Sequence, residues 1–275
     1  MSESSNLRAE WRLIQTPPAP GAWNMAVDEA ILEAAGSAAV LPTLRLYAWD
    51  PPCLSLGYAQ PINDADLPSL HQRGWQLVRR PTGGRAILHT DELTYSVCGP
   101  AHNPILAGSV LDSYRRLSAA LLAALHRLGI PAETHPTTPD HGKGPVCFEV
   151  PSNYEITIGG RKLIGSAQAR RKEGVLQHGS LPLYGDLGRI VQALVFPDKA
   201  ARQTAAQKLH SRAATLQEVS GRIIPWEKIA QAFIAAFEQT LSLRLTPSNL
   251  TPGELARVEE LAARKYADRN WTERV

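Results

Sequence analysis

Two β-strands joined by a glycine turn are predicted by NYEITIGGRKLIGSAQ, residues 153–168. The turn is Gly159-Gly160, and such a pair between two strand-like arms is a hairpin signal. A third strand-like run follows at 175–178. We therefore expect a meander of antiparallel strands in the middle of the chain.

Working outward, we expect strands on the N-terminal side of this meander and helices on its C-terminal side. Strand candidates are residues 11–15, 44–49, 54–58, 76–79, 85–88 and 93–97. Apolar residues at helical spacing predict helices over 22–35, 109–128, 226–241 and 254–266. Strands early and helices late indicate the α+β class rather than a regular βαβ alternation.

The composition is that of an ordinary globular protein. The 275 residues carry 29 Lys and Arg against 26 Asp and Glu, a net charge of +3 that is too mild to indicate a nucleic-acid partner. No secretory leader and no stretch of about 18 apolar residues is evident. With three separated cysteines, this predicts reduced thiols and a cytoplasmic location. We expect a domain over residues 1–210 and a helical C-terminal extension, 211–275, that packs on it without forming an independent domain.

The first segment that could carry chemistry is RRPTGGRAILH, residues 79–89. Its two adjacent glycines let the backbone approach a ligand closely, and their N–H groups can point inward. The arginines around them could receive a carboxylate, a phosphate or a thioester carbonyl. A plain β-turn with solvated arginines explains the same pattern.

The second segment is GPVCF, residues 144–148, at the end of a polar loop. Cys147 is either a reactive nucleophile carried on a loop or a small buried apolar side chain. Cys53 begins one strand-like run and Cys98 follows another, so we expect both to be packed in the core.

The third segment, GRKLIGSAQ (160–168), is followed by LQHGS (176–180). Lys162 could bind a carbonyl oxygen or lower the pKa of a thiol, or it could simply extend into water from the start of a strand. His178 is either a core histidine or an acid–base group. The eight histidines show no HxxxH or HxH pair, so no metal site is expected.

Taken together, these segments resemble the biotin/lipoate protein ligase superfamily. RRPTGGRAILH, DELTYS, GPVCFEVPSNYEI, GRKLIGSAQ and LQHGS occur in the same order and are similar to its cysteine-dependent octanoyltransferases. The resemblance implies a mixed, largely antiparallel sheet flanked by helices. It also implies transfer of octanoate from octanoyl-acyl carrier protein to a lysine of a lipoyl domain, such as glycine cleavage H protein or an E2 subunit. No cofactor, nucleic acid or membrane is implied.

The resemblance also assigns roles to individual residues. Cys147 would take the acyl group as a thioester, with Lys162 facing it as the second catalytic residue. The residues expected to bind substrate are Arg80, Gly83, Gly84, His89, Gly165, Ser166, Ala167, Gln168 and His178.

Three other functions are compatible with parts of this pattern. An ATP-dependent lipoate–protein ligase has a similar glycine loop, but this chain has Arg85 where the ligases have a third glycine, and it carries Cys147. An amidotransferase that moves octanoate from H protein to E2 subunits also uses a cysteine. A catalytically inactive carrier-binding scaffold would not need both Cys147 and Lys162.

Basic residues near the motifs predict a docking surface for the acidic acyl carrier protein, unless they are merely solvated charges at strand ends. They are Arg79, Arg80, Arg85, Arg161, Arg170, Arg171 and Lys172.

Overall fold

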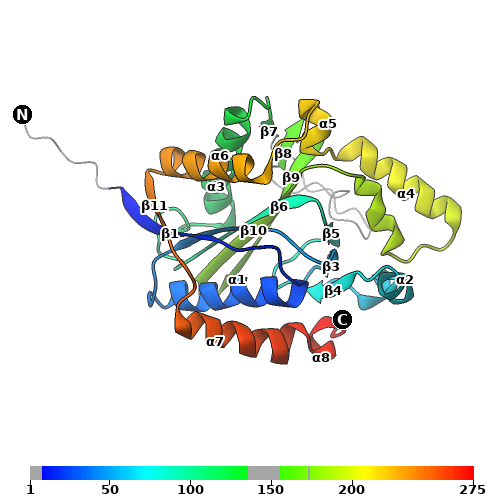
Figure 1. Cartoon of the computed structure of the whole chain (residues 1–275), viewed down its shortest axis with the longest axis horizontal. Helices are drawn as coiled ribbons and strands as arrows, with labels where there is room; N and C mark the ends of the chain where they lie inside the picture. The colour runs from blue at the N-terminus through cyan, green and yellow to red at the C-terminus, as the bar shows by residue number, and fades with distance from the viewer. Residues whose placement is uncertain (1–7, 136–154, 173) are drawn as a thin grey trace, which may run out of the picture.

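The computed structural model describes residues 8–135, 155–172 and 174–275. Within these ranges the main sheet contains β1 (Ala9–Gln15), β2 (Thr43–Tyr47), β6 (Glu92–Gly99), β7 (Glu133–His135), β8 (Glu155–Ile158), β9 (Arg161–Arg171), β10 (Gly174–Pro182) and β11 (Leu243–Pro247). Their order is β11-β1-β2-β6-β10-β9-β8-β7 (Figure 1). Among the described strands of this main sheet, only the pairs that involve β1 are parallel. The predicted α+β fold with a mixed, largely antiparallel sheet is confirmed.

A second, smaller sheet lies beside the first and carries the 79–89 motif. It contains β3 (Cys53–Leu56), β4 (Gln76–Arg79) and β5 (Ile87–His89) in the order β4-β3-β5, with η1 (Ile62–Asp64) and α2 (Leu67–Gln72) between β3 and β4. The motif begins at the end of β4 and finishes in β5, so its glycines form the connection between two strands of one sheet.

Two helix layers cover the main sheet. Helix α1 (Gly21–Gly36) packs with α7 (Pro252–Leu261) on one face, and α3 (Val110–Arg127) packs with α6 (Trp226–Thr240) on the other (Figure 1). A capping box between Ser109 and Asp112 starts α3, and Gly129, at a φ of 79°, follows its end. The predicted helix over 109–128 is therefore confirmed, and local chemistry fixes both of its ends.

Each face of the sheet has its own apolar core. The core under α3 and α6 includes Tyr95, Val97, Ile156 and Ile164, whereas the core under α1 and α7 includes Leu176. Because side chains alternate along a regular strand, these residues mark which face a neighbouring side chain occupies wherever no bulge intervenes.

The C-terminal third adds more than helices. It contains η3 (Leu187–Gln192), α4 (Lys199–Arg212), α5 (Leu216–Ser220), η4 (Ala262–Tyr266) and α8 (Arg269–Thr272). It also supplies β11, a strand that the sequence did not predict and that pairs along β1 at the edge of the main sheet. The division at residue 210 stays a prediction. In the part of the chain that the structure describes, every helix is too short or too polar to span a membrane.

Candidate active site

A pocket between α1, the small sheet and strands β9 and β10 brings the predicted motifs together. It encloses about 400 Å³ of empty space, counted out to its open side. Residues predicted to bind substrate supply much of its lining: Arg80, His89, Gly165, Ser166, Ala167 and His178. We call this cavity the main pocket. Its lining comes from segments as far apart in sequence as Met25 and Ser180, which local pattern alone could not bring together.

Arg80 shapes the glycine loop that borders the main pocket. Its guanidinium donates to the carbonyl oxygens of Gly83 at 2.8 Å and Arg85 at 2.7 Å, and to the Ser55 hydroxyl at 3.0 Å. Arg80 is only 3% exposed. In this structure its buried charge holds the loop in position by binding carbonyl oxygens.

The glycine loop lies so close to Gly57 that this position has no room for a side chain. Gly84 lies at a φ of 91°, a conformation that favours glycine. A Cβ atom placed on Gly57 would lie 1.9 Å from the Gly84 carbonyl oxygen. The backbones of β3's exit and the glycine loop are therefore in direct contact. Gly83, by contrast, is exposed, with open space where its Cβ would be.

His178 connects the loop to a buried carboxylate. Its Nε2 lies 2.6 Å from the Thr82 hydroxyl, and its Nδ1 lies 3.4 Å from Asp28 Oδ2. Burial lowers the pKa of His178, which the hydrogen bond to Asp28 only partly opposes. A neutral ring can donate from Nδ1 to Asp28 while accepting at Nε2 from Thr82. His178 therefore holds the glycine loop in place through Thr82.

Asp28 is itself the centre of a satisfied polar cluster beneath the pocket. It pairs with Arg45 at 2.8 Å and accepts hydrogen bonds from Tyr47 at 2.9 Å and Ser96 at 2.8 Å. Burial alone would raise the pKa of Asp28, but Arg45 and the hydrogen bonds of His178 and Ser96 outweigh it and lower the pKa. A carboxylate held in this way keeps its charge and can orient His178.

His89 is fixed on three sides. Its Nε2 lies 2.8 Å from the Ser55 hydroxyl and its Nδ1 lies 2.7 Å from Glu92 Oε1. Its ring stacks on Trp49, with the ring centroids 3.9 Å apart. The ring therefore presents one position and orientation to the pocket.

A β-bulge decides where Lys162 points. Ile156 pairs with Ile164, but Thr157 pairs with Lys162, so β9 carries one residue more than β8 at this point. Ile156 and Ile164 belong to the α3–α6 core. Side chains alternate along β8, so Glu155 and Thr157 lie on the opposite face, and the bulge places Lys162 with them. This is the face that carries Leu176 and His178.

The Lys162 ammonium forms an ion pair with Glu155, 2.6 Å from its Oε1. Both residues are buried, Lys162 to 3% exposure and Glu155 to 8%. The reading of Lys162 as a strand-end lysine reaching into water is therefore wrong. Lys162 does not line the main pocket as described, and its catalytic role stays a prediction.

Three of the residues predicted to bind substrate are not among those that line the main pocket: Gly83, Gly84 and Gln168. Gln168 donates to Gln177 at 2.9 Å and to Ser113 at 3.0 Å. Cys147 lies outside the described residues. Cys53 and Cys98 are fully buried free thiols whose pKa values burial raises, which confirms that they are core residues.

Several of the arginines predicted to dock an acidic carrier have other partners. Arg79 is fully buried and donates to the carbonyl oxygens of Gly57, Gln60 and Thr272. With Arg80 also buried, the prediction that these two arginines contact a carrier protein is wrong. Arg170 donates to the Leu106 carbonyl, and Arg161 pairs with Glu218.

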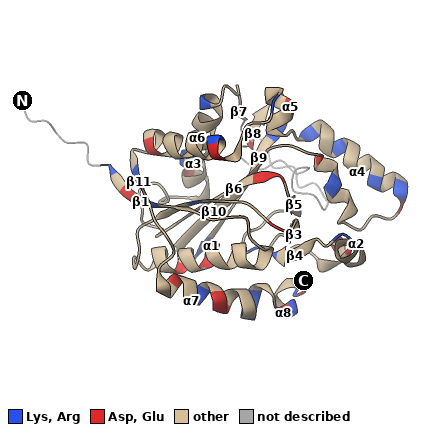
Figure 2. Cartoon of the chain, viewed as in Figure 1, with Lys and Arg blue, Asp and Glu red and all other residues tan. Residues whose placement is uncertain are grey.

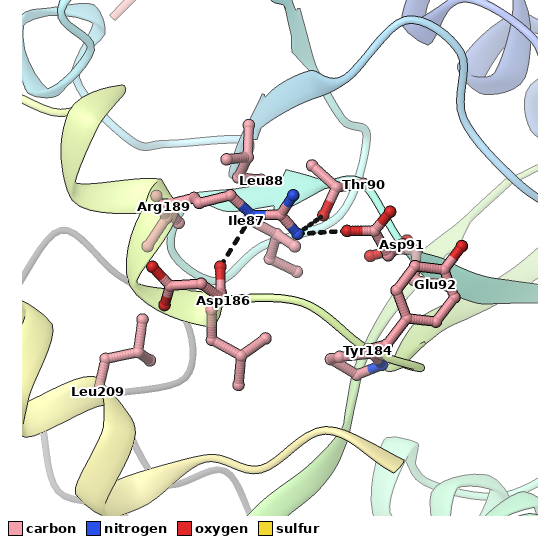
Figure 3. A pocket seen from close by; sticks show the side chains of 12 residues that line it. Ile87, Leu88, Thr90, Asp91, Glu92, Tyr184, Asp186, Arg189 and Leu209 are labelled. Atoms are coloured by element: carbon pink, nitrogen blue, oxygen red, sulfur yellow. Dashed lines mark hydrogen bonds and ion pairs between the residues drawn. The ribbon is translucent and has the colours of Figure 1, made fainter. Parts of the chain in front are cut away.

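A second pocket of about 470 Å³ borders β5 (Figure 3). Ile87 lines this second pocket and also the main pocket. The Arg189 side chain lines this second pocket and donates to Asp91 and, at 3.0 Å, to the Thr90 hydroxyl. Leu209 reaches it from α4. Nowhere in the described ranges do three potential metal ligands gather.

Sequence reasoning missed several residues that build this site. Asp28, Ser55, Thr82 and Glu155 received no role, although each contacts a predicted residue. One signal was available: Asp28 lies three positions after Met25 in a helix, so it shares an apolar face where a charge needs a partner.

Known proteins are similar to this chain along nearly its whole length. An octanoyltransferase LipM of Moorella thermoacetica is 43% identical, covering 96% of this chain and 98% of its own. Another from Symbiobacterium thermophilum is 40% identical, covering 98% and 100%. Among solved structures, a bipartite lipoate protein ligase of Thermoplasma acidophilum superposes with a TM-score of 0.80 at 26% identity, covering 96% of both chains.

A lipoate-protein ligase A bound with ATP superposes with a TM-score of 0.76 at 25% identity, covering 97% of this chain and 99% of its own. The sequence also matches the lipoyl protein ligase A/B catalytic domain over residues 20–238. These findings confirm the resemblance predicted from the motifs. The chain belongs to the lipoyl protein ligase A/B catalytic domain family.

Proposed function

We propose that this protein is an octanoyltransferase of protein lipoylation that carries octanoate as a thioester on Cys147. The donor is octanoyl-acyl carrier protein, and the acceptor is a lysine of a lipoyl domain. One observation supports a transferase over a ligase. The relatives named octanoyltransferase are 40–43% identical to this chain over nearly its whole length, whereas the ligases of known structure are 25–26% identical.

The chemistry divides into two half-reactions at one sulfur atom. In the first, the Cys147 thiolate attacks the carbonyl carbon of the donor thioester, the bond to the carrier's sulfur breaks, and the carrier leaves as a thiol with the proton that Cys147 released. In the second, the acceptor amine attacks the enzyme thioester, the bond to Cys147 breaks, and an amide forms. The amine's proton returns to the Cys147 sulfur. No nucleotide is consumed, because the thioester is already an activated acyl group.

The described residues support separate parts of this scheme. Cys53 and Cys98 are buried thiols with raised pKa values, which leaves Cys147 as the cysteine suited to be a nucleophile. The main pocket offers the apolar side chains of Met25 and Trp49 to an acyl chain. At about 0.8 kcal/mol for each buried CH₂ group, such a slot binds an eight-carbon chain by several kcal/mol.

Lys162 would act on the reacting carbonyl. An ammonium held by Glu155 is oriented and partly desolvated, so it can donate to the oxyanion that develops in both half-reactions. It can also favour the thiolate form of Cys147 if the two groups are adjacent.

Intact-mass measurement tests the covalent step. The protein is incubated with octanoyl-acyl carrier protein without nucleotide and is expected to gain one hydroxylamine-sensitive octanoyl group. Cys147→Ala should lose this adduct, whereas Cys53→Ser and Cys98→Ser, where they fold, should keep it. An adduct that persists on Cys147→Ala would overturn the mechanism. Addition of an apo lipoyl domain should then transfer the mass to the acceptor; transfer only with free octanoate and ATP would identify a ligase.

A further inference from the structure

Helix α4 has an unusual composition for a helix on the surface of a globular protein. Its fourteen residues, KAARQTAAQKLHSR, include Lys199, Arg202, Lys208 and Arg212 and contain neither Asp nor Glu. Over the whole chain, by comparison, 29 basic residues are nearly balanced by 26 acidic ones. Figure 2 shows the basic positions along α4, at one side of the molecule.

This helix buries little of its surface, and its basic residues lie close to one another along it. Leu209 is its only buried residue, although a helix of this length ordinarily buries an apolar stripe. Lys208 and Arg212 are four positions apart, and Lys199 and Arg202 are three apart; like charges at these spacings destabilise a helix. The sequence of α4 therefore favours an exposed positive surface at some cost in helix stability.

The position of α4 links this surface to the active site. The chain leaves the helix at Ala213, which bridges to Lys162, and the Ala214 amide donates to the Lys162 carbonyl at 3.0 Å. Leu209, the buried residue of the same helix, lines the second pocket (Figure 3). That pocket shares Ile87 with the main pocket. A protein resting on α4 would thus lie beside the strand that carries Lys162.

We propose that α4 is the docking surface for the body of an acidic carrier protein that delivers the octanoyl group. This inference rests on the proposed function. It replaces the buried Arg79 and Arg80 with the exposed Lys199 and Lys208 as the contacts, whereas Arg202 is half-buried and paired with Asp66. Charge complementarity between an acid-free helix and an acidic domain speeds encounter and fixes orientation, and it weakens as salt is added.

Steady-state kinetics with two donors tests this assignment. One donor is octanoyl-acyl carrier protein, and the other is octanoyl-pantetheine, which has the same thioester without the protein body. Lys199→Glu with Lys208→Glu should raise KM for the carrier donor roughly fivefold or more at low salt, since each exposed ion pair contributes up to about 1 kcal/mol. KM for octanoyl-pantetheine and for the acceptor lipoyl domain should not change.

The matched control reverses two exposed charges elsewhere, Lys228→Glu with Arg264→Glu, and should leave all three KM values unchanged. Lys199→Gln with Lys208→Gln should give a smaller effect in the same direction, and melting temperatures should verify that every variant folds. An unchanged carrier KM, an equal loss with octanoyl-pantetheine, or a shift in the acceptor KM instead would each overturn the proposal.

Binding measured by fluorescence anisotropy separates this proposal from the proposed function. Labelled octanoyl-acyl carrier protein should bind wild-type protein more tightly than the Lys199→Glu, Lys208→Glu variant, and the difference should vanish at high salt. If wild-type protein transfers octanoate from neither donor, the proposed function fails, while anisotropy still decides whether α4 binds the carrier.

Discussion

Replacing Lys162 with Met should affect stability and catalysis separately, because the side chain has a buried partner as well as a proposed role in the reaction. The substitution keeps a similar volume but leaves the carboxylate of Glu155, 8% exposed, without the ammonium 2.6 Å away. Removing one member of a buried ion pair costs about 3–5 kcal/mol. At roughly 2–4 °C for each kcal/mol, the melting temperature should fall by roughly 6–20 °C.

The same variant should also lose a factor of about 10²–10³ in turnover, the usual effect of removing one oxyanion donor. The two losses are separated by a second variant, Lys162→Met with Glu155→Leu. An apolar pair in place of a buried ion pair is often neutral for stability, so most of the lost melting temperature should return. Turnover should not return, because Leu and Met offer no hydrogen-bond donor.

Both quantities are measured on the same preparations, by calorimetry and by the mass of the lipoyl acceptor. Lys162→Arg serves as the matched charge-retaining control and should recover only part of the turnover, since a planar guanidinium does not replace a compact ammonium. Near wild-type turnover in the Met–Leu variant would refute a catalytic role for Lys162. A Lys162→Met protein that melts like wild type would refute the energetic importance of the ion pair.

Three further predictions follow from the pocket. Gly57→Ala should displace the glycine loop and reduce turnover at least tenfold, since its Cβ would lie 1.9 Å from the Gly84 carbonyl oxygen; activity within a factor of two would contradict this contact. Asp28→Asn should make the free energy of unfolding depend less on pH in the acid range. The lowered pKa of Asp28 stabilises the fold fully above about pH 4, and this contribution is lost as pH falls through the folded pKa. Urea unfolding of the variant should therefore show a smaller pH slope there, and an unchanged slope would count against the Arg45 pair. Met25→Ala should enlarge the main pocket and improve kcat/KM for decanoyl relative to octanoyl donors, and an unaltered preference would mean that the chain ends elsewhere.

The sequence by itself determined the elements whose signals are local. Helix α3 was predictable at both ends because Ser109 caps its first turn and Gly129 follows its last. Strand β4 was predicted at its observed bounds, 76–79. The motifs also identified most of the pocket lining, because each segment carries its glycines, histidines or arginines within a few residues.

Contacts between distant segments were decided only by the tertiary structure. Asp28 and His178 are 150 positions apart, and no periodicity relates them. Strand β11 is five residues long and forms only because β1 supplies its hydrogen-bond partners. The direction of Lys162 depends on one extra residue in β9, which appears only when β8 and β9 are paired. Alternation along a strand fixes a side chain's face relative to its neighbours, but a bulge resets that alternation, and a bulge exists only in a pair of strands.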